Sequence, residues 1–114
     1  MSGDKDLNLL NAEPGVMSAI ESWRDWLIHE RRCSRHTIDG YGRDLGFFLP
    51  FLNDHLGFPA GLKDLEKLKT ADFRSFLARR NADGLSRASM ARGLSTLRNF
   101  FRFLERRDLA HNAA

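Results

Sequence analysis

The sequence predicts an all-α protein, a compact bundle of four main helices. Three observations support this fold class. Apolar residues recur at steps of three and four along several segments, which is the spacing of a helix face. No segment shows the alternation of apolar and polar residues that marks a half-buried strand. Hydrophobic residues make up 42% of the 114 residues, which is enough for one domain with a modest core.

Residues 1–15 are predicted to form a mobile tail, because they are polar, lack helical periodicity and end in a Pro-Gly pair. The folded domain is expected to cover residues 16–114. Cys33 is the only cysteine, so no internal disulfide can form, which favours a reducing compartment. The longest apolar run, residues 47–52, is too short to cross a bilayer, and we see no signal peptide. These features predict a cytoplasmic protein with no membrane partner.

The first helix is expected over residues 16–32, and its two tryptophans are expected in the core. His29 and Arg32 have the His-x-x-Arg spacing that some strand-transfer enzymes use. They lie at the end of an amphipathic helix, where basic residues suit the macrodipole, so we interpret them as a helix terminus. The inward positions are Val16, Ile20, Trp23 and Leu27, with Trp26 beside them.

The second helix is expected to begin after Ser34, which is a good N-cap. Gly40 and Gly42 weaken this helix by up to ~1 kcal/mol each relative to alanine. They also allow another backbone, or a phosphate chain, to come close. Pro50 should kink the helix or end its regular part early. The apolar stripe consists of Ile38, Tyr41, Leu45, Phe48 and Leu52.

Three further segments complete the bundle. Residues 62–68 are expected to form a short helical turn after a loop rich in glycine and proline. Thr70 is expected to cap a third full helix that ends near Ala82, with Phe73, Phe76 and Leu77 inward. The longest helix is expected over residues 84–107 with Ser86 as its N-cap. Its apolar stripe is Met90, Leu94, Leu97, Phe101 and Leu104.

The opposite face of the longest helix carries no carboxylate. It consists of Arg92, Ser95, Asn99, Arg102 and Arg106. A basic face with hydroxyl groups suits a DNA groove or backbone. A simply solvated face is the more common explanation of such a pattern, and on this helix alone it ranks first.

Charge is distributed unevenly along the chain, although the net charge is only +3. Residues 1–30 hold two basic and six acidic residues, a net of −4. Residues 67–114 hold eleven basic and four acidic residues, a net of +7. This asymmetry suggests that one end of the chain faces a polyanion, although an incidental split is also common in small helical domains.

Two helices begin with the same pattern, in which a capping serine is followed directly by arginine and, three residues after the serine, by a second hydroxyl. Helix N-termini bind phosphate well, because their free N–H groups and the positive end of the dipole point outward. Two such ends near one surface could hold two points on a DNA backbone. Ordinary capping remains the alternative. The residues are Ser34, Arg35 and Thr37 in one helix, and Ser86, Arg87 and Ser89 in the other.

Patterns typical of enzymes are absent from the sequence. It has no glycine-rich phosphate loop, and one cysteine with four scattered histidines gives no zinc spacing. Tyr41 belongs to an apolar stripe and is a poor candidate for an attacking group. Asp39 and Asp44 are too isolated for an acid–base pair. The sequence therefore predicts no cofactor, no metal site and no catalytic residue.

Two segments resemble a known family. Residues 33–45, with Phe48 and the Phe-Leu pair after Pro50, resemble the second helix of the core-binding domain of Xer-type tyrosine recombinases. Residues 94–104 resemble the fourth helix of that domain. From about Val16 onward the chain is similar to the N-terminal SAM-like domain of these enzymes. The Leu-Glu-Arg-Arg and Asn-Ala-Ala sequences near the end look most like the XerC branch.

The resemblance implies a C-shaped clamp on double-stranded DNA, with the second and fourth helices against the major groove. The family's catalytic residues lie in a separate C-terminal domain that this chain lacks, so the chain alone would be inert. The parent enzyme would resolve chromosome dimers with an XerD-like partner recombinase, in a tetramer on DNA. A phage or integron integrase is the alternative within DNA binding. A helical protein–protein interaction module is the alternative from another class, with Phe103 and the two tryptophans at its contact surface.

The resemblance also assigns DNA-facing positions to this sequence. Thr37 and Ser89 would contact the DNA backbone, and Arg92 would contact a base. Phe103 lies on the polar side of its helix, so we expect C-terminal residues or a neighbouring subunit to cover it. The complete expected DNA-binding set is Ser34, Arg35, Thr37, Gly40, Arg43, Ser86, Arg87, Ser89, Arg92, Thr96, Asn99 and Arg102.

Overall fold

The structure, a computed structural model, describes residues 12–114 and is all-α, which confirms the predicted fold class. Its helices are α2 (Pro14–His29), α3 (Arg35–Leu56), α4 (Leu62–Lys67), α5 (Thr70–Ala82) and α6 (Arg87–Arg106). Most of the predicted tail, residues 1–11, lies outside the described part of the chain. Within residues 12–114, no helix is both long and apolar enough to cross a membrane.

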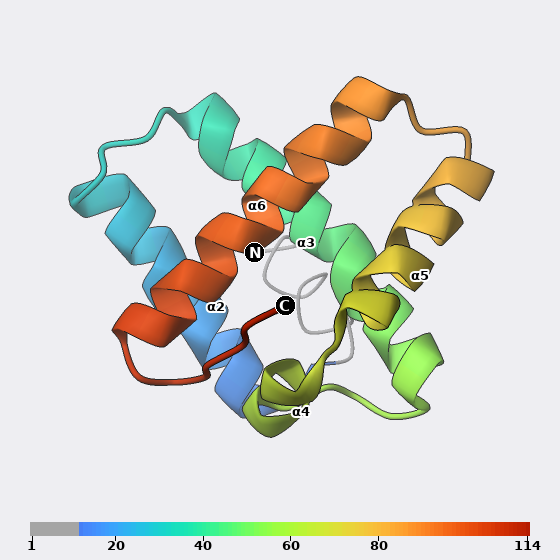
Figure 1. The fold of residues 1–114 in the computed structure, drawn as a ribbon. Coiled ribbons are helices and arrows are strands. Elements are labelled where there is room, and N and C mark those ends of the chain that lie inside the picture. Colours follow the sequence, from blue (N-terminus) through green and yellow to red (C-terminus); the bar gives the residue numbers. More distant parts are fainter. Residues whose placement is uncertain (1–11) are drawn as a thin grey trace.

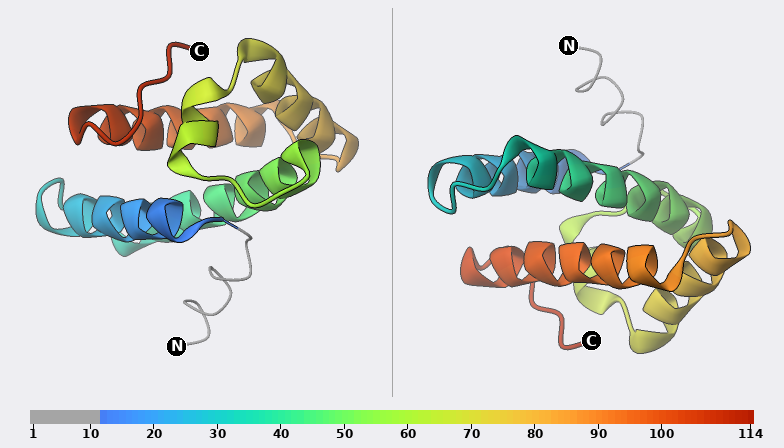
Figure 2. Two further views of the ribbon diagram at one scale, coloured as in Figure 1. Left: turned by 90° about the horizontal axis from the view of Figure 1, so that it is seen from below. Right: turned by 90° about the horizontal axis from the view of Figure 1, so that it is seen from above.

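The helices form two layers. α2 and α3 make one layer, and α6 crosses over them in the other, with α4 and α5 at its side (Figure 2). α3 and α6 pack against each other and cross like the strokes of an X (Figure 1). Their N-terminal halves diverge from this crossing, so the two N-termini lie at separate corners on the same side of the molecule (Figure 1).

Aromatic and aliphatic side chains from all these helices fill the space between the layers. Trp23, Phe48, Phe100 and Phe103 are almost completely buried. Phe48 lies edge-on to Phe76, with 5.1 Å between ring centroids, which joins α3 to α5. The inward positions predicted for α2 and α3 are confirmed apart from Trp26 and Tyr41, which are only partly buried.

Helix α2 begins two residues earlier than the sequence suggested. Pro14 occupies the first turn, where a missing N–H costs nothing and a fixed φ suits the helix. The helix ends at His29, and Arg32 lies beyond it with a φ of 52°. The Pro-Gly pair therefore forms the start of α2 and is not the end of a tail.

Helix α3 continues through Pro50 to Leu56, so the expectation that Pro50 could end the helix is wrong. The helix ends at Gly57, whose φ of 87° gives the left-handed C-cap that glycine favours. The Ser34 cap is confirmed, because the Ser34 side chain accepts a hydrogen bond from the Thr37 N–H.

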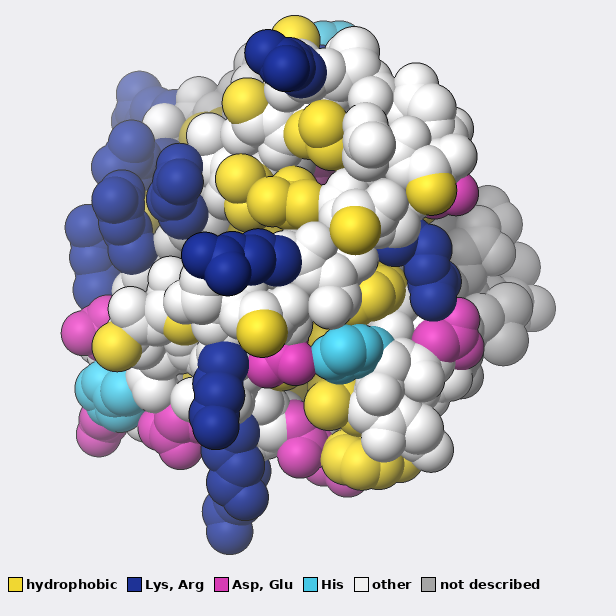
Figure 3. All heavy atoms as spheres, turned by 45° about the vertical axis from the view of Figure 1, so that its right-hand side comes forward, with side chains coloured by type: hydrophobic (Ala, Val, Ile, Leu, Met, Phe, Trp, Pro, Cys, Tyr) yellow, Lys and Arg dark blue, Asp and Glu magenta, His cyan; other side chains and the backbone are white. Residues whose placement is uncertain are grey.

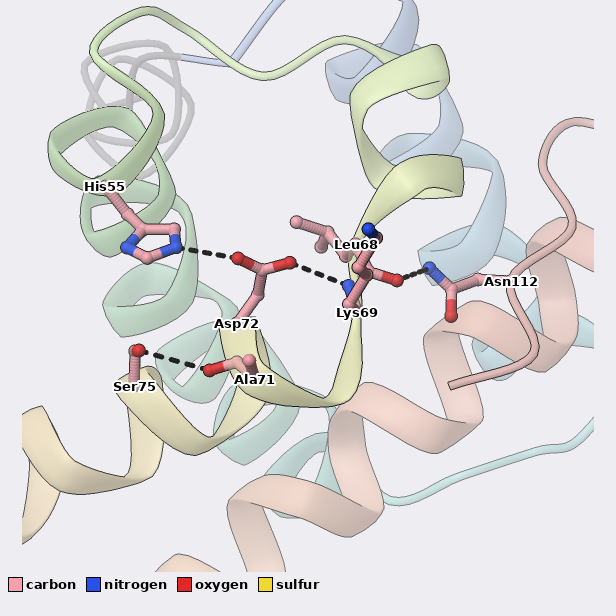
Figure 4. Close-up of polar contacts among 7 residues, drawn as sticks. All are labelled: His55, Leu68, Lys69, Ala71, Asp72, Ser75 and Asn112. Carbon is pink, nitrogen blue, oxygen red and sulfur yellow. Dashed lines mark hydrogen bonds and ion pairs between the residues drawn. The ribbon is translucent and has the colours of Figure 1, made fainter.

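Helix α5 is capped differently from the prediction, since Thr70 is its first residue and Lys69 its N-cap. The Asp72 carboxylate accepts a 2.7 Å hydrogen bond from the Lys69 N–H and lies 2.8 Å from His55 Nε2 of α3 (Figure 4). The backbone hydrogen bond from Lys69, and then the contact with His55, hold the pKa of Asp72 below its ordinary value. Asp72 thus caps α5 and ties it to α3.

The C-terminal residues pack against the α4–α5 corner. The Asn112 amide donates hydrogen bonds to the carbonyl of Leu65 at 2.7 Å and to that of Leu68 at 2.9 Å (Figure 4 shows the second). The His111 N–H donates to the Glu66 carboxylate at 3.0 Å. The Asn112 bonds thus add a donor to carbonyls near the end of the short α4, of which that of Leu65 also accepts from the Leu68 N–H at 3.4 Å.

The inward face of α6 is rotated relative to the predicted stripe. Leu97 and Leu104 are buried as expected, but Met90, Leu94 and Phe101 are only partly buried. The residues that complete the buried face are Thr96, Phe100 and Phe103.

Phe103 is 1% exposed and packs on Trp26 of α2, with 5.5 Å between ring centroids. The expectation that C-terminal residues would cover it is confirmed in part, because the Arg107 guanidinium lies 4.7 Å from the centre of the Phe103 ring. Trp26 of α2 supplies the aromatic cover, and no neighbouring subunit is needed to bury the ring. The helical wheel failed because α6 packs on α2 as well as on α3, and its apolar residues occupy more than one face.

Candidate nucleic-acid interface

The N-terminal ends of α3 and α6 share one hydrogen-bonded geometry. At the start of α3, Ser34 Oγ accepts from the Thr37 N–H at 3.1 Å and donates to Thr37 Oγ1 at 3.0 Å. At the start of α6, Ser86 Oγ accepts from the Ser89 N–H at 3.2 Å and donates to Ser89 Oγ at 3.1 Å. The sequence repeat is therefore a structural repeat, and the two caps are equivalent.

The two capped ends face the same side of the molecule, at the two corners left by the divergence of α3 and α6 (Figure 1). Each end leaves backbone N–H groups without helical partners and carries the positive end of its dipole. An exposed arginine follows each capping serine, Arg35 in α3 and Arg87 in α6. The arrangement presents two equivalent anion-binding ends to a ligand that is long enough to touch both.

Arg43 and Arg92 supply further positive charge along the same two helices. Both side chains are exposed. Among residues 12–114, no ion pair involves these two arginines or the arginines at the caps. Arg92 lies in the second turn of α6, where side chains of a recognition helix reach base edges.

Gly40 lies between the α3 cap and Arg43. A Cβ atom built at Gly40 would meet no other atom within 4 Å. No neighbour in the described structure therefore requires glycine at this position, although glycine weakens a helix. The empty space leaves room for an external group at Gly40, as it also does at Gly42.

Thr96 requires a correction, because its side chain is 0% exposed. Its hydroxyl donates a 2.7 Å hydrogen bond to Asp44 Oδ2 of α3, and it also lies 3.2 Å from the Arg92 carbonyl. The hydroxyl is therefore unavailable to DNA, and Thr96 leaves the expected contact set. The error arose because the resemblance to the family, which assigned Thr96 to DNA, does not show which face of α6 meets α3.

Asn99 is engaged inside the protein as well. Its Oδ1 accepts a 2.9 Å hydrogen bond from the indole N–H of Trp23, so the acceptor group is not free for a base. Arg102 is exposed but lies about 22 Å along the helix from Arg87, at ~1.5 Å per residue. It lines a hollow of about 410 Å³ next to Ala113 and Ala114, well away from the capped ends.

Sequence reasoning did not assign a role to Asp44, because the isolated carboxylate had no visible partner. Its partner Thr96 lies 52 residues further along the chain, and no local pattern links the two. Thr96 itself entered the sequence analysis only through the resemblance, which assigned it to DNA.

Among residues 12–114, no group of three or more His, Cys, Asp or Glu side chains could bind a metal ion. The view from the α5 side shows Lys and Arg side chains spread around a patch of apolar side chains (Figure 3). A hollow of about 410 Å³ accompanies this apolar surface between α5 and α6, lined by Leu77, Met90 and Leu94 among others.

Comparison with known proteins identifies relatives over nearly the whole chain. The phage integrase N-terminal SAM-like domain family matches residues 20–108. A tyrosine recombinase XerC of Rhodospirillum centenum is 46% identical over 102 residues, covering 90% of this chain and 30% of the relative. The corresponding protein of Mesorhizobium japonicum is 43% identical over 105 residues, covering 92% and 34%.

A third relative, the tyrosine recombinase XerC of Rhizobium meliloti, is 45% identical over 100 residues, covering 88% of this chain and 31% of the relative. The chain thus spans about a third of the length of these curated relatives. No solved structure matches the chain.

Proposed function

Because the chain belongs to the phage integrase N-terminal SAM-like domain family, we propose that it is the DNA-binding domain of a tyrosine recombinase. The observation that carries the proposal is the pair of equivalent capped ends of α3 and α6. They lie on one side of the molecule, each with an exposed arginine that forms no ion pair within residues 12–114. Duplex DNA offers phosphates at regular spacing on both sides of a groove, which suits two separated anion-binding ends.

We assign the contacts according to these positions. Ser34, Thr37, Ser86 and Ser89 shape the two helix ends that hold phosphates. Arg35 and Arg87 add charge there, and Arg43 binds a phosphate further along α3. Gly40 lets the DNA backbone approach α3 closely. Arg92 reads a base, since its guanidinium can take guanine O6 and N7 together.

The activity of the whole protein is a further step of the proposal, since the relatives are about three times as long as this chain. The relatives' name, tyrosine recombinase XerC, supports a parent enzyme that exchanges DNA strands at a specific site. We propose that it does so with a second, XerD-like recombinase in a tetramer on DNA, and that it resolves chromosome dimers. Catalysis would belong to the part of the enzyme outside this chain.

The competing interaction module depended on Phe103 and the two tryptophans as a contact surface. Phe103 and Trp23 are each 1% exposed, so neither can form such a surface in the folded chain. Trp26 is only partly buried, but it packs on Phe103, so the three side chains do not form the contact surface that this alternative required. The integrase alternative differs only in the biological task, and the names of the relatives favour the XerC assignment.

Titration of a labelled duplex with the chain, at low and at physiological salt, tests the proposal. We expect binding in the range of ~10⁻⁴–10⁻⁶ M that weakens steeply with salt. Replacing Arg35, Arg87 and Arg92 together by alanine should abolish measurable binding. Arg74→Ala is the matched control, because Arg74 is also exposed and unpaired among the described residues but lies on α5. No binding at low salt, or equal loss in the control, would refute the proposal.

A further inference from the structure

We propose that the hydrogen bond between Thr96 and Asp44 sets the distance between the two capped helix ends, so that both can hold phosphates of one duplex. This inference rests on the proposed function and gives these two residues a positioning role. Neither residue needs to touch DNA. The contact joins α6 to α3 where the two helices cross, which is the point from which their N-terminal halves diverge (Figure 1).

We call the helix segment between each capping serine and the Thr96–Asp44 hydrogen bond an arm, and the two arms have equal length. Asp44 is the tenth residue after the Ser34 cap, and Thr96 is the tenth residue after the Ser86 cap. Each arm is therefore about 15 Å long at ~1.5 Å per residue. A rotation of one arm by about 10° at the contact would move its end by about 2.6 Å. That displacement exceeds the tolerance of a hydrogen bond to phosphate, which weakens beyond ~3.2 Å between heavy atoms.

The Thr96–Asp44 hydrogen bond is directional, and a contact that fixes the distance between the two capped ends has to be directional. The other side chains buried where α3 meets α6, such as Leu45 and Leu97, are apolar, and apolar packing has little directional preference. The Thr96 hydroxyl is fully buried and its 2.7 Å bond goes to a carboxylate, which makes it a strong and geometrically defined contact. Among residues 12–114, Asp44 forms no ion pair, so its orientation depends on Thr96.

A second hydrogen bond provides a matched control. The indole of Trp23 donates to Asn99 at 2.9 Å, less than one turn along α6 from Thr96. This bond ties α6 to α2, and α2 carries neither of the two caps. Trp23→Phe breaks it and keeps an aromatic ring against Tyr41 and Phe100, so the core is disturbed while the Thr96–Asp44 bond between α3 and α6 stays in place.

The experiment measures duplex affinity of the 114-residue chain at low salt, together with thermal stability. Thr96→Val removes the hydroxyl at nearly constant volume, and Asp44→Ala breaks the same bond from α3 should Thr96→Val not fold. We expect each to weaken duplex binding about tenfold, the equivalent of one hydrogen bond to a charged group. Thr96→Ser, which retains the hydroxyl, and Trp23→Phe should stay within about twofold of the original affinity.

A second readout separates positioning from stability. In the original chain, Arg87→Ala should weaken binding, because the α6 end reaches the duplex. In the Thr96→Val background the same change should have a much smaller effect, because that end is already displaced. Equal losses in Thr96→Val and Trp23→Phe, or an unchanged effect of Arg87→Ala, would overturn this inference alone. An original chain that binds no duplex would instead refute the proposed function.

Discussion

The indole N–H of Trp23 donates a hydrogen bond to Oδ1 of Asn99, with 2.9 Å between nitrogen and oxygen. The bond connects the middle of α2 to the middle of α6 across 76 positions of sequence. The same indole stacks on Tyr41, with 5.5 Å between ring centroids, and lies 5.1 Å from Phe100. Trp23 of α2 therefore contacts side chains of both α3 and α6.

Replacement of Asn99 by alanine should lower the free energy of unfolding by about 1–3 kcal/mol, because it leaves the buried indole N–H without a partner. Urea denaturation followed by tryptophan fluorescence measures the change. Asn99→Asp retains an acceptor and serves as the control, with a smaller loss. An alanine variant as stable as the original chain would show that water replaces the amide oxygen at no cost.

Alanine at Gly40 and at Gly42 should each stabilise the chain by about 0.5–1 kcal/mol, since the added methyl group meets nothing within 4 Å and the unfolded state loses freedom. Thermal melts measure this gain. Only Gly40→Ala should weaken duplex binding, because only Gly40 lies on the proposed DNA-facing side. If both variants bind DNA as the original chain does, the DNA backbone does not approach α3 at Gly40.

Arg92→Ala should weaken binding to the cognate site by about 1–3 kcal/mol more than binding to a scrambled duplex, because a bidentate contact with guanine discriminates by this amount. The comparison requires the full-length enzyme and its site. Arg106→Ala is the control from the same helix. Its guanidinium lies 5.8 Å from the centre of the Trp26 ring, so we expect at most about 1 kcal/mol of lost stability and no lost specificity.

An equal loss on both duplexes would assign Arg92 to a phosphate. In that case another side chain of the DNA-binding enzyme must make the sequence-specific contact with a base.

Asp72 should make stability dependent on pH in the acid range. Its pKa in the folded chain is lowered, so its contribution is complete above the ordinary value of 3.8 and is lost as the pH falls through the lower folded pKa. Asp72→Ala should lower the free energy of unfolding at neutral pH by about 0.5–2 kcal/mol through loss of the α5 cap. The gap between the two proteins should close in acid. A constant gap from neutral pH down to pH ~3 would contradict this account.

Features that depend on residues three or four positions apart were predictable from the sequence. The Ser34 and Ser86 caps are examples, since a serine before a helix needs only the N–H groups that follow it. The equivalence of the two ends was also visible, because both helices begin with the same residue types. Whether these ends bind DNA remains a prediction.

The pairing of helix faces could not be predicted, because it depends on contacts between distant segments. Asp44 and Thr96 are an example: each looks like an ordinary surface residue in its own helix. α6 has apolar residues on more than one face, Phe101 on one and Phe103 on another, so periodicity alone did not determine which face packs inward. The assignment of Asn99 to DNA depended on that choice, whereas that of Thr96 came from the resemblance to the family.

The hydrogen bonds of Asn112 affect the choice of the C-terminal boundary when a fragment of this domain is expressed. The family match ends at residue 108, yet Ala110 is 2% exposed and Asn112 bridges the carbonyls of Leu65 and Leu68. A fragment that stopped at residue 108 would uncover the site of Ala110 and leave those carbonyls to water. A boundary drawn from sequence similarity alone would therefore remove the residues that close the α4–α5 corner.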